Sequence, residues 1–183
     1  MYMTMNKQHD KFVFLAATML AASLLFTTTT TTRTALAASL NGTNGDDSIN
    51  GTNEDDRINA KKGRDSVQGL DGNDNINAGE GNDQVFGSSG DDVVRGEAGN
   101  DLLIGDDGND ELIGGTGNDQ MEGGAGNDYL SGGDDDDRLM GGFGADTFDC
   151  GKGTDTIYEL NLAEGDTMTS PEDCETIDRT VPA

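Results

Sequence analysis

The sequence from Gly42 to Tyr158 repeats every nine residues without a gap. The sixth place of each nonapeptide is Asp, the eighth is apolar, and the fourth is Gly except at Glu54 and Asp135. A fixed period of this kind is the signature of a repeat architecture, in which each repeat packs only against its neighbours. The thirteen repeats are GTNGDDSIN, GTNEDDRIN, AKKGRDSVQ, GLDGNDNIN, AGEGNDQVF, GSSGDDVVR, GEAGNDLLI, GDDGNDELI, GGTGNDQME, GGAGNDYLS, GGDDDDRLM, GGFGADTFD and CGKGTDTIY.

Each nonapeptide divides into a turn and a short extended segment. Gly at places one and four tolerates positive φ and a close backbone approach, so the first six residues can turn tightly. Places seven to nine alternate, so that place eight faces one side and places seven and nine face the other. Two nonapeptides then form one coil with a strand on each side, and stacked coils form two parallel sheets. We therefore predict an all-β fold, a parallel β-roll (a right-handed β-solenoid) of thirteen nonapeptide repeats.

The place-six Asp should share the inward side with place eight and stack on the Asp two repeats later. A column of unneutralised carboxylates repels strongly at low dielectric, and a hard cation between the coils would remove that conflict. Carboxylate and carbonyl oxygens in six-fold or higher coordination favour Ca²⁺ over Mg²⁺, which dehydrates reluctantly. The predicted calcium ligands are Asp47, Asp56, Asp65, Asp74, Asp83, Asp92, Asp101, Asp110, Asp119, Asp128, Asp137, Asp146 and Asp155.

The charge and histidine content exclude several classes of function. The chain has 36 Asp and Glu residues against 11 Lys and Arg, a formal net charge of -25. This charge excludes nucleic-acid binding through a basic face and opposes docking on anionic membranes. The one histidine, His9, precedes the repeats. The repeats therefore lack imidazole bases, Ser-His-Asp and Cys-His systems and His-ligated zinc, and we expect no enzyme activity.

The nonapeptide pattern of this sequence resembles the hemolysin-type calcium-binding repeat of RTX proteins, G-G-x-G-x-D-x-U-x with U apolar. Residues 114–122, 123–131 and 141–149 match every fixed place. The resemblance implies a parallel β-roll in which each Ca²⁺ lies between turns two repeats apart. The place-six Asp and turn carbonyls would bind the ions, up to about 11 in number.

Departures from the pattern are expected to weaken some of these sites. We expect full sites mainly between residues 69–77 and 123–131, and weaker ones toward the N-terminal end. The departures are Glu54 and Asp135 at place four, the cations Lys61, Lys62 and Arg64 in the third turn, and Ala145 and Thr154 at place five.

Residues 1–37 have the composition of a secretory signal peptide. Lys7 and Lys11 give a basic start before an apolar stretch at 12–26, and Ala35-Leu36-Ala37 is a small-x-small cleavage pattern. We predict cleavage after about Ala37, a short lead at 38–41 and a secreted, extracellular protein without a membrane span in the mature chain. The alternative is an uncleaved anchor, although the stretch is shorter than the roughly 20 residues that span a bilayer.

The tail at 159–183 breaks the period and is predicted to cap the open end of the roll. The candidate residues that would cover the last coil are Leu160, Leu162, Met168 and Ile177. Cys150 and Cys174 are the only cysteines. In a secreted chain, two cysteines suggest one disulfide, with two free thiols as the alternative.

We therefore expect a secreted, non-catalytic calcium-binding protein that folds as it binds Ca²⁺. The lead before the first repeat is too short to hold an enzyme domain such as RTX toxins, proteases and lipases carry. The alternative function is an adhesin-like extracellular interaction or matrix module with a cell-surface or matrix partner. A third hypothesis, an enzyme or toxin fragment, is disfavoured by the missing histidine. Val93, Leu102, Ile104 and Ile113 suggest an outer apolar patch for a partner or for self-association.

Overall fold

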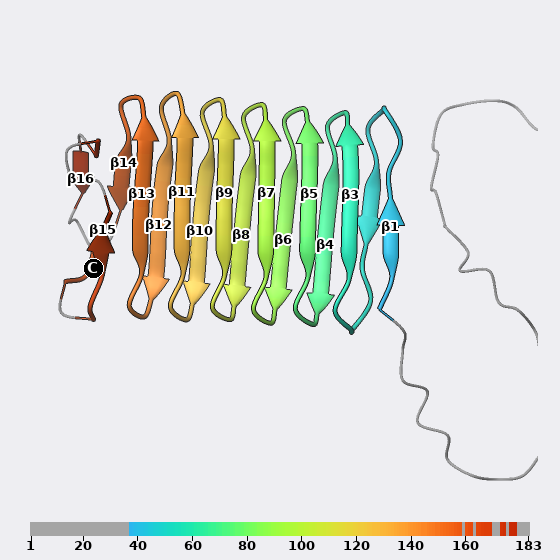
Figure 1. Ribbon diagram of the computed structural model, residues 1–183, viewed down its shortest axis with the longest axis horizontal. Coiled ribbons are helices and arrows are strands. Elements are labelled where there is room, and N and C mark those ends of the chain that lie inside the picture. The colour runs from blue at the N-terminus through green and yellow to red at the C-terminus, as the bar shows by residue number, and fades with distance from the viewer. Residues whose placement is uncertain (1–36, 159, 163, 170–172, 175, 179–183) are drawn as a thin grey trace, which may run out of the picture. The chain divides into compact units, whose positions relative to one another are not determined.

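The repeats fold into a roll of two parallel sheets (Figure 1). The computed structural model describes residues 37–158, 160–162, 164–169, 173–174 and 176–178, so the predicted signal peptide lies outside them except for Ala37. One sheet contains, in spatial order, β1 (Ser39–Asn41), β3 (Arg57–Lys62), β5 (Asn75–Glu80), β7 (Val93–Ala98), β9 (Glu111–Thr116), β11 (Tyr129–Asp134), β13 (Thr147–Lys152) and β15 (Thr167–Met168). The other contains β2 (Ser48–Asn50), β4 (Ser66–Asp71), β6 (Gln84–Ser89), β8 (Leu102–Asp107), β10 (Gln120–Ala125), β12 (Arg138–Phe143), β14 (Thr156–Tyr158) and β16 (Thr176–Asp178). The predicted all-β parallel roll is confirmed.

The register of the strands confirms that two nonapeptides make one coil. Met121 of β10 pairs with Leu103 of β8 on one side and with Leu139 of β12 on the other, all of them place-eight residues. Successive nonapeptides therefore lie in opposite sheets. In the part of the chain that the structure describes, no helix is long and apolar enough to cross a membrane.

The strands are longer than the sequence predicts. Those from β3 to β13 each span six residues, from place seven of one nonapeptide to place three of the next. Because adjacent coils have the same shape, each backbone group meets the matching group one coil away, and pairing continues past place nine. For example, the N–H of Gly63 donates to the carbonyl of Glu80 (2.9 Å). The turn is therefore confined to places four to six.

The hydrophobic core is a single stack of place-eight side chains between the two sheets. Its middle is fully buried, and Leu40, Ile49 and Met168 pack against it at the two ends. Ala60 and Ala78, at place one, add methyl groups to the same core. The buried place-eight residues are Ile58, Val67, Ile76, Val85, Val94, Leu103, Leu112, Met121, Leu130, Leu139, Phe148 and Ile157.

The glycines at places one and four have different roles. The place-four glycines from Gly63 to Gly153 adopt positive φ, as at Gly99 (134°), and Asp135 adopts it at this place as well (81°). The place-one glycines do not adopt a positive φ. A β-carbon at Gly69 would instead collide with a carboxylate oxygen of Asp74 and the carbonyl of Gly87, so Gly at this place permits close approach.

The tail continues the roll at its C-terminal end. Thr167 and Met168 pair with Thr147 and Phe148, so β15 extends one sheet. Of the predicted covering residues, Leu160 is buried and Met168 packs against the core. The prediction for Leu162 is wrong, because its side chain is 61% exposed. The fourth candidate, Ile177, pairs with Ile157 through its backbone in β16.

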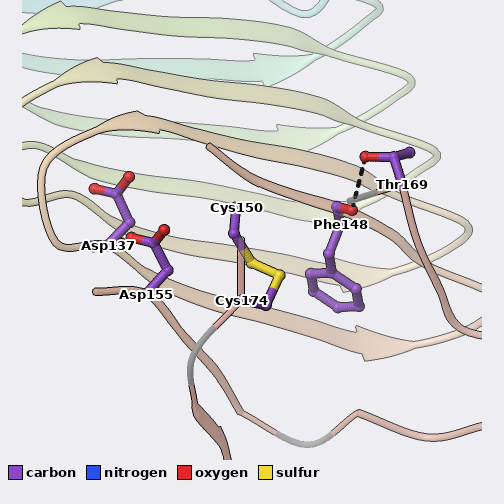
Figure 2. Close-up of a disulfide and its surroundings, with 6 residues drawn as sticks. All are labelled: Asp137, Phe148, Cys150, Asp155, Thr169 and Cys174. Atoms are coloured by element: carbon purple, nitrogen blue, oxygen red, sulfur yellow. Dashed lines mark hydrogen bonds between the residues drawn. A yellow bond between two sulfur atoms is a disulfide. The ribbon is translucent and has the colours of Figure 1, made fainter. Parts of the chain in front are cut away.

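The predicted disulfide between Cys150 and Cys174 is present (Figure 2). Cys150 occupies place one of the last nonapeptide, and both cysteines belong to the buried core. The backbone N–H of Thr169 also donates to the carbonyl of Phe148 (2.9 Å). The hydroxyl of Thr169 donates to the same carbonyl (3.2 Å; Figure 2), so both bonds join the tail to the last coil. The tail is thus attached to the roll both covalently and by strand pairing.

Replacing both cysteines by Ala is expected to lower the free energy of unfolding by about 3 kcal/mol in the chain-entropy account of a cross-link. Ala already occupies place one at residues 60 and 78, so the Cys150→Ala change should fit the coil. Urea denaturation at saturating Ca²⁺, with and without reductant, measures the effect. An unchanged denaturation midpoint after reduction would contradict it.

Candidate metal centre

The place-six carboxylates form two buried columns, one along each turn edge of the roll. Within a column, Oδ1 of each Asp from Asp65 to Asp155 accepts a hydrogen bond from the backbone N–H of the Asp one coil earlier, as from Asp92 to Asp110 (2.8 Å). Figure 2 shows Asp137 and Asp155 side by side in adjacent coils, and here the N–H of Asp137 donates to Asp155 (2.8 Å). The predicted inward orientation of place six is confirmed for the buried members, Asp56 to Asp155.

The second carboxylate oxygen of most of these residues is buried without a hydrogen-bond partner. A buried anionic oxygen with no donor is costly, so the site favours either a proton or a cation. The residues whose Oδ2 lacks a partner are Asp65, Asp74, Asp83, Asp92, Asp101, Asp110, Asp119, Asp128, Asp137 and Asp146.

The pKa values of these carboxyl groups reflect this environment. Burial raises the pKa of Asp92, Asp119, Asp128 and Asp137 to about 7, and the backbone hydrogen bond to Oδ1 offsets only part of the rise. Neighbouring carboxylates in the same column raise these pKa values further. Burial likewise raises the pKa to about 6 at Asp65, Asp74, Asp101 and Asp110, and it also raises the pKa of Asp83 and Asp146.

For several of these Asp residues, the unpartnered oxygen and a backbone carbonyl from the next coil approach the same place-one glycine. At Gly105, the position that a β-carbon would take is approached by Oδ2 of Asp110 and by the carbonyl oxygen of Gly123. The same pair of groups meets beside Gly69, Gly96, Gly114 and Gly123. The donors are therefore all oxygen atoms, carboxylate and carbonyl, as a hard cation such as Ca²⁺ requires.

Side chains alone would not complete such a site. Among the described residues, no three or more His, Cys, Asp or Glu side chains cluster closely enough to hold a metal ion. Carbonyl oxygens of the turns would have to supply the remaining ligands, which agrees with the high coordination number of Ca²⁺. The residues present thus fit a calcium ion bound by two Asp of one column and by backbone oxygens.

One column opens to solvent along a trough on the turn edge. The trough has a volume of about 480 Å³ and is lined by Asp101, Asp119 and Asp137 with their place-five neighbours Asn100 and Asn118. Its lining is mainly polar and acidic, so ions can reach the carboxylates without crossing the apolar core.

A second ladder runs along the turns at place five, and the sequence reasoning missed it. The side-chain oxygen of Asn109 accepts a hydrogen bond from the N–H of Asn127 one coil later (2.9 Å), opposite in sense to the place-six ladder. Ala145 still takes part, because its N–H donates to Asn127 (2.8 Å). Thr154 donates in the same way to Asp136 (2.8 Å). These two departures from Asn or Asp therefore keep their place in the ladder.

The N-terminal end of the columns differs from the middle. The second oxygens of Asp47 and Asp56 accept hydrogen bonds from the place-two N–H groups of Thr43 and Thr52. Lys61 donates its ammonium group to the carbonyl of Gly42 (2.6 Å). Oxygens in the first two repeats thus already have donors from the chain itself.

The structure adds Asp166, which the sequence reasoning did not assign to the columns. Asp166 is buried, and its Oδ1 accepts the N–H of Asp146 (3.0 Å) in the position of a place-six residue. Its Oδ2 accepts the N–H of Asn161 (2.6 Å). The available signal was Asp166-Thr167-Met168, which repeats the Asp-x-apolar order of places six to eight two residues out of period.

The repeats also match a known sequence family. The family model of the RTX calcium-binding nonapeptide repeat, which contains four copies, matches residues 37–67, 50–85, 60–94, 86–121, 113–148 and 122–157. Together these matches span residues 37–157, well over half of the chain. No curated protein matches the sequence.

Proposed function

Because the chain belongs to the RTX calcium-binding nonapeptide repeat family, we propose that it is a secreted, non-catalytic protein that folds around calcium ions. The ions would lie between successive coils of the roll, next to the place-six Asp columns. Calcium would supply positive charge where the fold brings carboxylates together. Folding and binding are then a single event.

The observation that carries this proposal is the row of buried Oδ2 atoms without a hydrogen-bond partner. Their burial raises the carboxyl pKa values toward 7, so the fold without a cation must hold protons or unfavourable charge. We assign full sites to the middle of the roll, where Oδ2 lacks a partner in successive coils. Asp47 and Asp56, whose Oδ2 atoms accept Thr N–H groups, would contribute less.

The same residues argue against catalysis. The only sequence family found in the chain is the repeat itself, and the one histidine lies before it. The carboxylates are arranged for charge neutralisation along a column, and each place-six Asp has the same surroundings one coil later. Such a uniform series supports many equivalent ions better than a single reaction centre.

Secretion is supported by the chemistry of both ends of the chain. The disulfide between Cys150 and Cys174 requires an oxidising compartment to form and persist. The basic start, apolar stretch and Ala35-Leu36-Ala37 pattern agree with an N-terminal secretory signal.

Calorimetric titration with Ca²⁺ is expected to show about two fewer bound ions for Asp110→Asn than for the unchanged protein. In the proposed arrangement, Asp110 contributes to the site on either side of it in the column. The matched control is Asp107→Asn, which removes the same charge from an exposed place-three residue. The control should keep its stoichiometry. Equal stoichiometry in Asp110→Asn, or no heat with Ca²⁺ for the unchanged protein, would overturn the proposal.

A further inference from the structure

The sheet formed by the even-numbered strands β2 to β16 carries an apolar strip on its outer surface. Places seven and nine point outward, and from β6 to β14 they include the half-buried side chains of Phe86, Leu102, Ile104, Met140 and Tyr158. The four-residue patch expected from the sequence is wrong, because Val93 and Ile113 lie on β7 and β9 of the other sheet. We propose that the apolar strip is the contact surface for a second copy of this chain.

The strip is hollowed at its centre. A trough of about 260 Å³ is lined by Leu102, Met140 and Tyr158 together with the charged residues Glu122 and Arg138. Its floor includes the core residues Met121 and Leu139. An apolar side chain from a partner could bury itself there, which is how the central residues of interfaces gain most of their energy.

The charges of this face point to a self-complementary partner. Glu122 and Arg138 are the only charged residues at places seven and nine of the even-numbered strands β2 to β14. Neither belongs to an ion pair within the described part of the chain. On the opposite sheet, by contrast, Arg95 pairs with Glu111 (3.5 Å). In a two-fold symmetric contact, Glu122 of each copy can pair with Arg138 of the other.

A second copy fits the local charge of this strip better than a polyanionic or polycationic partner does. The acidic residues concentrate in the turns, in the internal columns and at strand ends such as Asp106 and Asp107, so places seven and nine of this sheet carry one positive and one negative side chain. The five strands, four of six residues and β14 of three, cover at most roughly 24 by 20 Å, below the ~800 Å² per partner of standard interfaces. We therefore expect weak association, with a dissociation constant in roughly the micromolar range or above.

Sedimentation velocity in saturating Ca²⁺ tests this inference. Protein concentrations from about 5 to about 500 µM cover the dissociation constants expected of a weak interface. The sedimentation coefficient of the unchanged protein should rise with concentration. Leu102→Asp should remove the rise, whereas the matched change Ile113→Asp on the opposite sheet should leave it. Far-UV circular dichroism in Ca²⁺ confirms that each variant keeps its strand signal.

Charge reversal then distinguishes this specific contact from nonspecific association. Glu122→Arg and Arg138→Glu should each weaken association about tenfold, and the double variant should restore it, because the two charges exchange places across the two-fold axis. A monomer at every concentration would overturn the inference. Association that survives Leu102→Asp, or that the double reversal does not restore, would overturn it as well, while calcium titration tests the proposed function separately.

Discussion

Removing calcium with excess chelator is expected to abolish most of the far-UV circular dichroism signal of the strands. The core is one side chain thick, so hydrophobic burial per coil is small compared with the entropy of ordering eighteen or so residues. In addition, the columns place buried carboxylates one coil apart without donors for Oδ2. With calcium withdrawn at neutral pH, the like charges of each column repel one another at low dielectric.

The measurement is a calcium titration followed by circular dichroism, with the signal recovering when Ca²⁺ is restored. An equal ionic strength of sodium chloride serves as the control, because salt screens charges at a distance but does not coordinate buried oxygens. Magnesium should restore much less signal than calcium. A strand signal that persists unchanged in chelator would show that the roll does not depend on calcium.

In chelator, lowering the pH from about 8 to about 4.5 is expected to restore strand structure, because protons replace the missing cations. The folded-state pKa values of Asp92, Asp119, Asp128 and Asp137 are raised to about 7 from the ordinary value of 3.8. A carboxyl group with a raised pKa binds protons more tightly in the folded chain. Its contribution to stability is complete below the unfolded pKa and is lost as the pH rises through about 7.

Calcium should reverse this dependence on pH. Ca²⁺ binds the deprotonated carboxylates, so its apparent affinity is expected to fall as the pH drops below about 7. Thermal melts monitored by circular dichroism across this range, in chelator and in saturating Ca²⁺, separate the two forms. A chelator-treated chain that loses strand signal on acidification, or stays unfolded throughout, would contradict the expected role of the buried carboxyl groups.

The period of the sequence determined most of the architecture. A strict nonapeptide with an apolar place eight permits few solutions other than stacked coils, so the two sheets, their register and the core were predictable. The inward direction of place six followed from alternation, because Asp and the apolar residue are two positions apart. The cysteine pair was predictable from composition and compartment.

Features that depend on contacts between coils were harder to predict. The place-five ladder joins a side-chain oxygen of Asn109 to a backbone N–H of Asn127, and such pairing leaves no pattern beyond Asn itself. The close packing of Gly69 on Asp74 concerns backbone distance rather than residue type. Asp166 was missed because the last coil has two extra residues, which displaces it from the period.

The outer patch was misplaced for a simpler reason. Val93 and Leu102 occupy the same place in consecutive nonapeptides, and consecutive nonapeptides lie in opposite sheets. When the residues at places seven and nine are assigned to sheets by alternate repeats, the two outer faces separate. Phe86, Ile104 and Met140 then fall on the same face.

Because of this alternation, adding or removing one nonapeptide has a different effect on the roll from adding or removing two. Insertion or deletion of a full coil changes its length by about 4.8 Å and preserves the sheet in which every later residue lies. Loss of a single nonapeptide would instead transfer every later strand to the opposite sheet. Phe86 and Tyr158 would then face opposite sides of the molecule. Evolution of this chain can therefore adjust its length in whole coils while keeping its surfaces, whereas half-coil changes exchange one surface for the other.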